Sequence, residues 1–453
     1  MAMLTTSLTP LDYWIAERIG AGGSDAPLAP EVLEQWRNAK KADLIQQVRA
    51  HSPFYRYRLP DVPGGACSRE EWAALPLTTA DDLRLHGPEM LCVSQGEVSR
   101  VTTLPTSGTS GQPKRIFFTK DDLGRTVDFF HHGMSTFTRP GQVVLVFMPG
   151  ELPDSIGDLL RRAMPRMGCE AVVHGLAGDP EAALEAIHGV RADVIVGLPV
   201  QVLAMARHPR SALGRRLSAV LLSADHVSQA LRTAVEQAFG CPVYAHWGMT
   251  ETGYGGGVEC GARHGYHLRG ADLFVEIIDP VNGLIMPDGV PGEVVISTLT
   301  AQAMPLLRYR TGDLASLLPE PCPCGCRLPR LGPIQGRLRD RVSLDDGTIL
   351  SMAALDDALL VLPWLINFQA ATYRKNGSWI LDLEIFGSPS SGTSKKPSAM
   401  RQAIETALNA TGILKQDGLR LGTITTGAPS DRLSGPVKRS LQIGMFHGTE
   451  MSD

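Results

Sequence analysis

The chain has 453 residues, and its 43 basic side chains nearly balance 47 acidic ones, for a formal net charge of −4. This length exceeds what one hydrophobic core organises, so two or three domains are expected. The charges are scattered rather than grouped in blocks, which speaks against a nucleic-acid-binding surface.

The N-terminus lacks the charged flank and apolar core of a signal peptide. No apolar run reaches the length of about 18 residues that a membrane span needs. The 8 cysteines are too few for a disulfide scaffold in a chain this long. We therefore expect a cytoplasmic protein with reduced thiols and no membrane or nucleic-acid partner.

The predicted elements change character three times along the chain. Apolar residues at three-and-four spacing predict helices over residues 8–58. From about residue 142, short β-branched runs alternate with helical segments as far as "CPVYAHW", which predicts βαβ units around a buried parallel sheet. After residue 270, "DLFVEIID", "EVVISTL" and "RYRTGDLASLL" predict antiparallel strands. Beyond residue 338 the pattern predicts a small α+β unit with a flexible loop around residues 387–398.

These elements predict an α/β protein with a large N-terminal domain, residues 1–338, and a small mobile α+β C-terminal domain, residues 339–453. The large domain combines helices, parallel βαβ sheets and an antiparallel β subdomain that carries a cysteine cluster. We find no internal repeat.

The stretch "TSGTSGQPK", residues 106–114, gathers hydroxyls and glycines ahead of a lysine. Glycines let backbone amides point into one concavity, and hydroxyls and an ammonium group add donors for an anion. The stretch is not a Walker loop, because Pro113 stands where that motif needs a Gly-Lys pair. It is not a dinucleotide fingerprint either, because the third glycine is missing. An exposed polar turn is the alternative to an anion site.

This stretch resembles the phosphate loop of the adenylate-forming superfamily: acyl-CoA synthetases, adenylation domains and luciferases. Three further motifs follow in the same order as in that superfamily: "YAHWGMTETG" at 244–253, "RYRTGDL" at 308–314 and "GRLRD" at 336–340. The segments "SPFYRYRLP", "TLTAQAMPLLRYRTGDL" and "CPCGC" resemble the phenylacetate–CoA ligase branch. The resemblance covers most of the chain.

The resemblance implies a role for each motif in joining a carboxylate to AMP. The loop would hold the β- and γ-phosphates of ATP, Thr250 an α-phosphate oxygen, Glu251 a Mg²⁺ ion, and Asp313 the ribose hydroxyls. Trp247, which stands where a tyrosine is commoner, and Tyr244 would flank adenine. The full expected nucleotide set is Thr106, Ser107, Gly108, Thr109, Ser110, Gly111, Lys114, Ser223, Ala224, Asp225, Tyr244, His246, Trp247, Gly248, Met249, Thr250, Asp313 and Arg337.

In this superfamily a lysine of the small domain bridges the acyl carboxylate and the α-phosphate. Lys438 in "SGPVKRS" is the candidate, although its spacing departs from the family pattern by two residues and a solvated surface lysine is the alternative. Arg339 stands at the hinge where the family usually has an aspartate, and Asp340 follows it. The resemblance implies that the small domain rotates about this hinge between two half-reactions.

Three cysteines fall within five positions of "PCPCGC", and "ECGARHGYHL" adds a cysteine and histidines. Thiolates and imidazoles are the ligands that Zn²⁺ takes in closed tetrahedral sites. We predict a structural zinc on Cys260, His267, Cys322 and Cys324, with Cys326 and His264 in reserve. Unligated reduced cysteines are the alternative.

The sequence says least about the acid. The helical stretch "DFFHHGMSTF" offers Phe130 and His131 as substrate contacts, although a helix histidine more often has a structural role. Its aromatic character fits an aryl or medium-sized hydrophobic acid. We thus expect an acid–CoA ligase that uses ATP, Mg²⁺ and CoA. An enzyme that passes the acyl group to another acceptor and a nucleotide-binding protein with little turnover are the alternatives, and a homodimer is a hypothesis.

Overall fold

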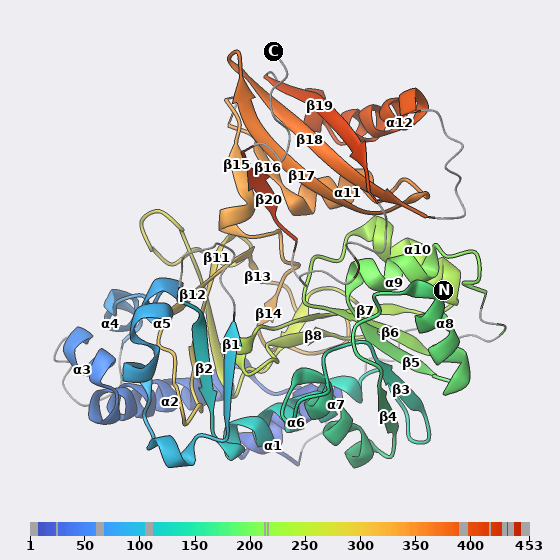
Figure 1. The fold of residues 1–453 in the computed structure, drawn as a ribbon. Helices are drawn as coiled ribbons and strands as arrows, with labels where there is room; N and C mark the ends of the chain where they lie inside the picture. Colours follow the sequence, from blue (N-terminus) through green and yellow to red (C-terminus); the bar gives the residue numbers. More distant parts are fainter. Residues whose placement is uncertain are drawn as a thin grey trace. The chain divides into compact units, whose positions relative to one another are not determined.

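The computed structural model describes residues 8–23, 26–59, 68–104, 112–212, 214, 217–345, 347–388, 397–415, 418–427, 433 and 439–444. Figure 1 shows its helices and strands. The chain forms two compact units. The first unit comprises residues 1–141, 150–170 and 244–334, and the second comprises residues 142–149, 171–243 and 335–453. The third segment of the second unit begins at Gln335, close to the boundary expected at residue 338, which stays a prediction.

The first unit begins with the helices that the N-terminal periodicity predicts. Its helical elements are α1 (Pro10–Arg18), α2 (Pro30–His51), α3 (Pro53–Arg58), α4 (Arg69–Ala74), α5 (Ala80–His86), η1 (Gly87–Met90), η2 (Gln95–Glu97), α6 (Lys120–Met134), α7 (Ile156–Ala163), η3 (Met164–Met167) and η4 (Thr250–Thr252). Helices α1, α4, α5 and α6 each begin with a capping box, in which a Ser or Thr hydroxyl and a carboxylate three residues later satisfy the first backbone N–H groups. Among the described helices, none is both long and apolar enough to cross a bilayer.

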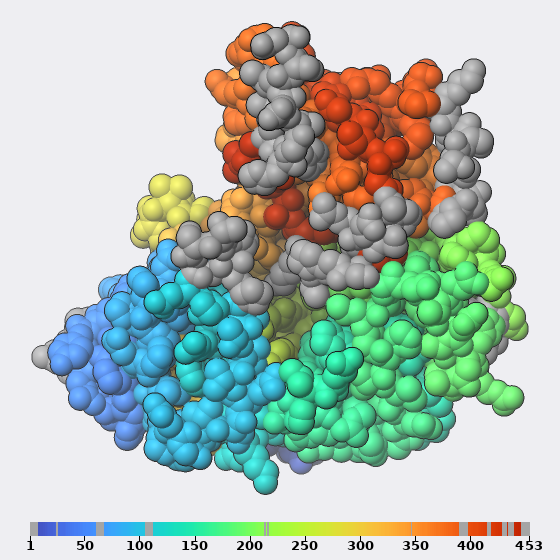
Figure 2. All heavy atoms as spheres, viewed as in Figure 1, coloured from blue at the N-terminus to red at the C-terminus, as the bar shows by residue number. Residues whose placement is uncertain are grey.

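Three antiparallel arrangements make up the strands of the first unit. They are the hairpin β1 (Arg100–Leu104) and β2 (Lys114–Phe118), the sheet β10 (Leu273–Ile278), β11 (Gly292–Thr298) and β12 (Tyr309–Ala315), and the run β13 (Leu317–Leu318), β14 (Arg330–Leu331), β9 (Tyr266–Leu268), β8 (Gly257–Glu259) and β7 (Val243–Trp247). The antiparallel strands predicted after residue 270 are thereby confirmed. The connection between β10 and β11, yellow in Figure 2, stands out on the surface and carries the exposed Val281 and Leu284.

The second unit contains the predicted parallel strands, β3 (Val143–Val146), β5 (Val194–Gly197) and β6 (Ala219–Ser223), which pair in the order β3-β5-β6. All residues of β5 and β6 are buried, as continuous apolar strands of a parallel sheet should be. The accompanying elements are β4 (Glu170–Val173), α8 (Pro180–Gly189), α9 (Pro199–Ala206) and α10 (Gln229–Phe239), and α8, α9 and α10 lie beside β5 and β6 (Figure 1).

The C-terminal segment of the second unit has the predicted α+β composition. Its elements are η5 (Leu338–Asp340), β15 (Arg341–Ser343), β16 (Ile349–Ser351), α11 (Met352–Leu359), β17 (Leu365–Lys375), β18 (Ser378–Gly387), α12 (Pro397–Ala410), η7 (Ile413–Lys415), β19 (Leu419–Thr426) and β20 (Leu441–Ile443). The four-stranded sheet has the order β19-β18-β17-β20, with β17 and β18 antiparallel and the outer two pairs parallel. One hydrophobic core joins it to the α/β part, from Ile195 on β5 to Phe368 on β17.

Candidate nucleotide site and cysteine cluster

The predicted phosphate loop lies within the β1–β2 hairpin. Leu104 pairs with Lys114, and these two residues flank the loop on either side. Thr106, Ser107, Gly108, Thr109, Ser110 and Gly111 lie outside the described residues, as does Lys438. Of the predicted loop residues, Lys114 is the one that the structure describes.

Lys114 meets residues from two of the other motifs. Its ammonium Nζ donates to Oε1 of Glu251 at 2.5 Å, and the hydroxyl of Tyr309 donates to the same oxygen at 3.1 Å. Burial, and then the Glu251 carboxylate, raise the pKa of the Tyr309 phenol above its usual value, so the phenol remains a donor at neutral pH. The predicted phosphate cation and the predicted metal ligand are thus in direct contact, from segments 137 residues apart.

The loop that carries Thr250 and Glu251 is held in place from both sides. A Cβ at Gly248 would lie 2.6 Å from His246 Cε1 and 2.7 Å from the Tyr254 carbonyl oxygen, so only glycine fits there. Tyr254, at φ 64°, forms a hydrogen bond of 2.6 Å with Thr102 Oγ1 and stacks on Phe118. These contacts tie the Thr-Glu turn to both strands of the phosphate-loop hairpin.

Asp313, which is predicted to bind the ribose, is oriented by Trp247, which is predicted to flank adenine. The indole Nε1 of buried Trp247 donates to Oδ2 of Asp313 at 3.1 Å. The backbone N–H of Asp313 donates to Thr311 Oγ1 at 3.0 Å, and Gly312 between them has φ 75°. This explains the tryptophan: its N–H holds one carboxylate oxygen of Asp313 at a fixed position.

The remaining predicted nucleotide residues belong to the second unit. Ser223 ends β6, and Ala224 follows at φ 77°, a conformation unusual for a residue with a Cβ. Such outliers concentrate at ligand-binding turns. Arg337 precedes η5, where exposed Arg339 forms an ion pair of 3.7 Å with buried Asp340.

Aromatic rings gather around β7 and α6. Tyr244 stacks on Phe137 with ring centroids 4.6 Å apart, and the His246 ring lies 6.0 Å from that of Phe129. Burial lowers the pKa of His246 to about 4, so its imidazole is neutral at pH 7. Of the predicted substrate contacts on α6, Phe130 is buried, and the His131 ring packs 4.4 Å from that of His132. Whether they contact the acid stays a prediction.

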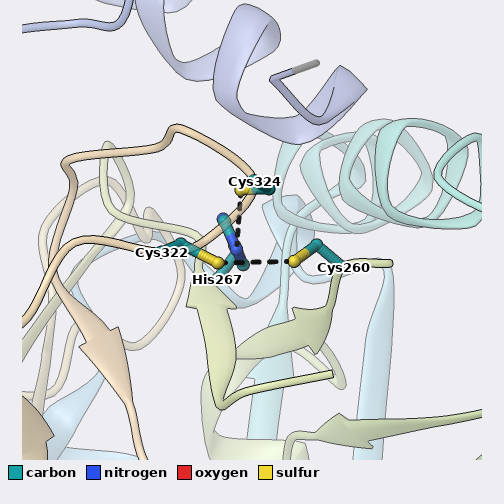
Figure 3. Close-up of side chains that lie close together, drawn as sticks. All are labelled: Cys260, His267, Cys322 and Cys324. Atoms are coloured by element: carbon teal, nitrogen blue, oxygen red, sulfur yellow. Dashed lines mark hydrogen bonds between the residues drawn. The ribbon is translucent and has the colours of Figure 1, made fainter. Parts of the chain in front are cut away.

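The four predicted zinc ligands converge. Figure 3 shows the side chains of Cys260, His267, Cys322 and Cys324 pointing toward one another. Their ligand atoms all lie within 4.8 Å of one another. The Sγ atoms of Cys260 and Cys322 are 3.5 Å apart, and Sγ of Cys324 lies 3.7 Å from Nε2 of His267. Both distances are close to the edge of about 3.7 Å of a tetrahedron with Zn–S bonds of about 2.3 Å, so the set fits the ion.

The two reserve ligands have other partners. Cys326 lies with Asp12 and His267 in a second buried group, where its Sγ is 3.1 Å from Asp12 Oδ1. The same carboxylate oxygen lies 3.2 Å from Nδ1 of His267, which leaves Nε2 facing Cys324. The Arg330 guanidinium lies 3.3 Å from Nδ1 of His264. Asp12 on helix α1 therefore fixes the orientation of the imidazole.

Sequence reasoning assigned no role to Asp12 or Tyr309. Tyr309 lies inside the motif "RYRTGDL", so the sequence could have identified it as a site residue. Its contact with Glu251 could not have been predicted from the motif. Asp12 gave no signal, because it lies 255 residues before the histidine that it orients.

Comparisons with known proteins agree with the motifs. Residues 81–304 match the family of AMP-binding enzymes. The chain is 31% identical over 363 residues to a phenylacetate-coenzyme A ligase of Thermus thermophilus, covering 78% of this chain and 80% of that protein. It is 28% identical over 340 residues to the enzyme of that name from Pseudomonas putida, covering 72% and 75%.

Solved structures share the fold. A 2-hydroxyisobutyryl-CoA ligase in the postadenylation state aligns with a TM-score of 0.76 at 20% identity, over 91% of this chain and 89% of that chain. An anthranilate CoA ligase aligns with a TM-score of 0.57 at 16% identity, over 76% and 66%. Together with the four ordered motifs, the family match and the ligase relatives establish that the chain belongs to the adenylate-forming superfamily, in its phenylacetate–CoA ligase-like branch.

Proposed function

We propose that this protein is an AMP-forming acid–CoA ligase. In the first half-reaction a carboxylate attacks the α-phosphorus of ATP and releases pyrophosphate, which gives an acyl-AMP. In the second, the thiol of CoA attacks the acyl carbon, AMP leaves with the bonding electron pair, and the thiol proton is released. The observation that carries the proposal is the contact of Lys114, Glu251 and Tyr309, which unites residues of three motifs in one cluster.

Different residues would bind different parts of the two substrates in the first half-reaction. A carboxylate and a triphosphate repel each other, so the protein must hold both anions and neutralise them. Lys114 would supply a cation at the end of the phosphate-loop motif, and Asp313, oriented by Trp247, would accept hydrogen bonds from the ribose hydroxyls. Lys438 would bridge the acyl carboxylate and the α-phosphate.

Glu251 would hold Mg²⁺. Magnesium is usually bound through one or two carboxylates together with substrate phosphates, and buried Glu251, in contact with Lys114 at the end of the phosphate-loop motif, fits that pattern. When bound, the ion supplies charge neutralisation between the triphosphate oxygens. Thr250, the neighbour of Glu251, offers a hydroxyl for an α-phosphate oxygen.

The acid is proposed to be aromatic, and phenylacetate is the first candidate. The two curated relatives named above carry that substrate in their names. The rings of Phe129, Phe137, Tyr244 and His246 gather where α6 meets β7. Apolar and aromatic side chains line most sites for small organic ligands.

We propose a structural zinc on Cys260, His267, Cys322 and Cys324. The ligand set comprises three sulfurs and one nitrogen, which is a common closed set for a structural ion. A closed site of this kind joins loops and leaves no position for substrate. It would fasten the loop after β8 to the cysteine-rich turn between β13 and β14.

A panel of carboxylic acids tests the function. Acid-dependent release of pyrophosphate from ATP, followed by a thioester once CoA is added, is the expected result. Pyrophosphate release without a CoA product would favour an enzyme that passes the acyl group to another acceptor. Arg339, which stands at the hinge where the family usually has an aspartate, is the feature that motivates this alternative. The full aryl panel giving neither product would contradict the proposal. An Asp313→Asn variant, which weakens the proposed ribose contact, should release less pyrophosphate than the unmodified protein with the same acid.

A further inference from the structure

We propose that Cys324 is an oxidative modification site at which peroxides attack the cysteine cluster, and that the attack ends in a disulfide between Cys324 and Cys260 and in release of the zinc ion. The proposal rests on the structural zinc proposed above. The residues that carry it all belong to the first unit, within residues 1–141 and 244–334. Figure 3 shows that Cys322 and Cys324 reach the cluster from one turn, whereas Cys260 reaches it from another segment.

Cys324 is the cysteine of the cluster that can be reached from outside. It is partly exposed, whereas Cys260 and Cys322 are buried at 1% and 4% exposure. A cavity of about 420 Å³ borders the cluster, so a molecule of the size of hydrogen peroxide can enter it. Its wall includes residues of α1, of the segment after α6, of the loop after β8 and of the cysteine-rich turn, among them Pro10, Tyr13, Thr136, Arg139, Ala262 and Cys324. A peroxide that enters the cavity therefore meets Cys324 before the two buried cysteines.

The charge of the cavity wall suits this reaction. The Arg139 guanidinium lines the cavity, and its Nη1 donates to the carbonyl oxygens of Thr138 and Ser135 at 2.8 and 3.3 Å, which holds the group in place. No carboxylate is among the described residues that line the cavity. Cysteines that react with oxidants are partly exposed and lie near cations. A cation in the wall also favours the departure of hydroxide when the peroxide bond breaks.

One hydrogen peroxide balances the reaction. The Cys324 thiolate attacks one peroxide oxygen, so that an S–O bond forms, the O–O bond breaks and hydroxide leaves with the electron pair, which gives a sulfenic acid. The Cys260 thiolate then attacks the Cys324 sulfur, so that an S–S bond forms, the S–O bond breaks and a second hydroxide leaves. The two thiolates lose two electrons, which reduce the peroxide to two hydroxides. Two of the four proposed ligands are consumed, so the site no longer retains its ion.

Cys260 is the partner because it comes from a different segment of the chain. The ligand atoms of the cluster lie within 4.8 Å of one another, so its sulfur is within reach of Cys324. Cys322 is separated from Cys324 by one residue, and a disulfide between these two would close a small ring of unfavourable geometry. The Sγ atoms of Cys260 and Cys322 are only 3.5 Å apart, but both residues are buried. Proximity alone thus predicts a disulfide between those two, whereas access from the cavity predicts one that contains Cys324.

The test follows the oxidised residue and the zinc together, without an activity assay. The zinc-loaded protein is treated with one equivalent of hydrogen peroxide beside a chelator that changes colour on binding zinc, and a parallel sample contains dimedone to trap sulfenic acid. We expect one zinc ion to be released and two thiols to be lost for each peroxide consumed. After quenching in acid, peptide mass spectrometry should find dimedone on Cys324 and, in the untrapped sample, a disulfide between Cys260 and Cys324.

Two histidine variants separate access from the loss of a ligand. Cys324→His keeps a ligand for zinc but removes the accessible thiolate, so peroxide should release zinc about ten-fold or more slowly. Cys322→His is the matched control, because it replaces a buried cysteine of the same turn, and its rate should stay within about two-fold of that of the unmodified protein. The zinc content of each variant is measured before the peroxide is added.

Three results would overturn the proposal: dimedone on Cys260 or Cys322 in place of Cys324, a disulfide between Cys260 and Cys322, or zinc release from Cys324→His as fast as from the unmodified protein. If the histidine variants do not fold or do not hold zinc, the mapping on the unmodified protein decides the question by itself. A protein purified without chelators that carries no zinc would instead contradict the zinc site proposed above.

Discussion

Replacing Asp12 by asparagine should weaken binding at the proposed zinc site, although Asp12 is not one of the four proposed ligands. Its Oδ1 lies 3.2 Å from Nδ1 of His267, and its Oδ2 accepts from the backbone N–H and the hydroxyl of Thr9 at 3.2 and 2.8 Å. An asparagine has one acceptor oxygen. Whichever way its amide turns, either the imidazole or the helix cap loses its acceptor, and the negative charge is lost in both cases.

The size of the effect follows from the arrangement of the partners. A carboxylate behind a ligating imidazole fixes the ring and raises its basicity, and losing it typically costs about 10- to 100-fold in metal affinity. That range corresponds to about 1.4–2.7 kcal/mol. Both side chains are buried, at 5% and 2% exposure for Asp12 and His267, so water cannot readily replace the lost acceptor and the upper half of the range is expected.

The assay is a competition for zinc between the purified protein and a chelator that changes colour on binding. Asp82→Asn is the matched control, because Asp82 forms the same capping box with Thr79 on α5 and lies outside both cysteine-containing groups. A loss of affinity in Asp12→Asn alone is the expected result. Equal affinity in Asp12→Asn and the unmodified protein would refute the role of Asp12, and an unmodified protein purified without chelators that carries no zinc would refute the site.

Three further predictions concern the nucleotide residues and the pH dependence. Glu251→Gln should lower acid-dependent pyrophosphate–ATP exchange by about 100-fold or more, since it removes the carboxylate proposed for magnesium, and Lys114→Met should lower it by about ten-fold or more. Trp247→Phe keeps a ring but removes the donor to Asp313, so kcat/KM for ATP should fall by about ten-fold, measured at saturating acid. Burial lowers the pKa of His246 from 6.5 to about 4, so its contribution to stability is present above pH 6.5 and is lost as the pH falls toward 4. Between pH 7 and pH 5 the free energy of unfolding should therefore drop by up to about 2 kcal/mol because of this group. His246→Gln should flatten that drop in urea titrations.

Most secondary structure could be predicted from the sequence, because the signals are local. The alternation of β-branched runs and amphipathic segments from residue 142 identified the strands that pair as β3-β5-β6 and the helices between them. Residue chemistry selected the four side chains of the cysteine cluster that the structure brings together, since few other residue types bind zinc; that they hold the ion stays a prediction. The motifs that resemble the adenylate-forming superfamily identified Lys114, Glu251 and Asp313, because each motif is a short local stretch of sequence.

The partners that orient these residues could not be predicted. Asp12 reaches His267 across 255 positions, and Asp225 reaches Arg439 across 214. An aspartate in a helical cap has many ordinary uses, so Asp12 carries no sequence signal of its own. The resemblance gave Asp225 a nucleotide role but did not predict its arginine partner. Only the fold brings such residues to their partners.

The geometry around Glu251 also bears on whether the protein merely binds a nucleotide. A site that only retained ATP would gain from cations and backbone N–H groups near the phosphates, and a buried carboxylate there would repel them. Glu251 is nonetheless buried next to the phosphate-loop hairpin, with Lys114 at 2.5 Å to balance its charge. Lys114 offsets the burial of the carboxylate itself, whereas the repulsion between that carboxylate and a bound polyanion would be relieved by a divalent cation shared between the two. Because such a cation would neutralise charge as pyrophosphate leaves, the proposed role of Glu251 suits phosphoryl chemistry better than storage of the nucleotide.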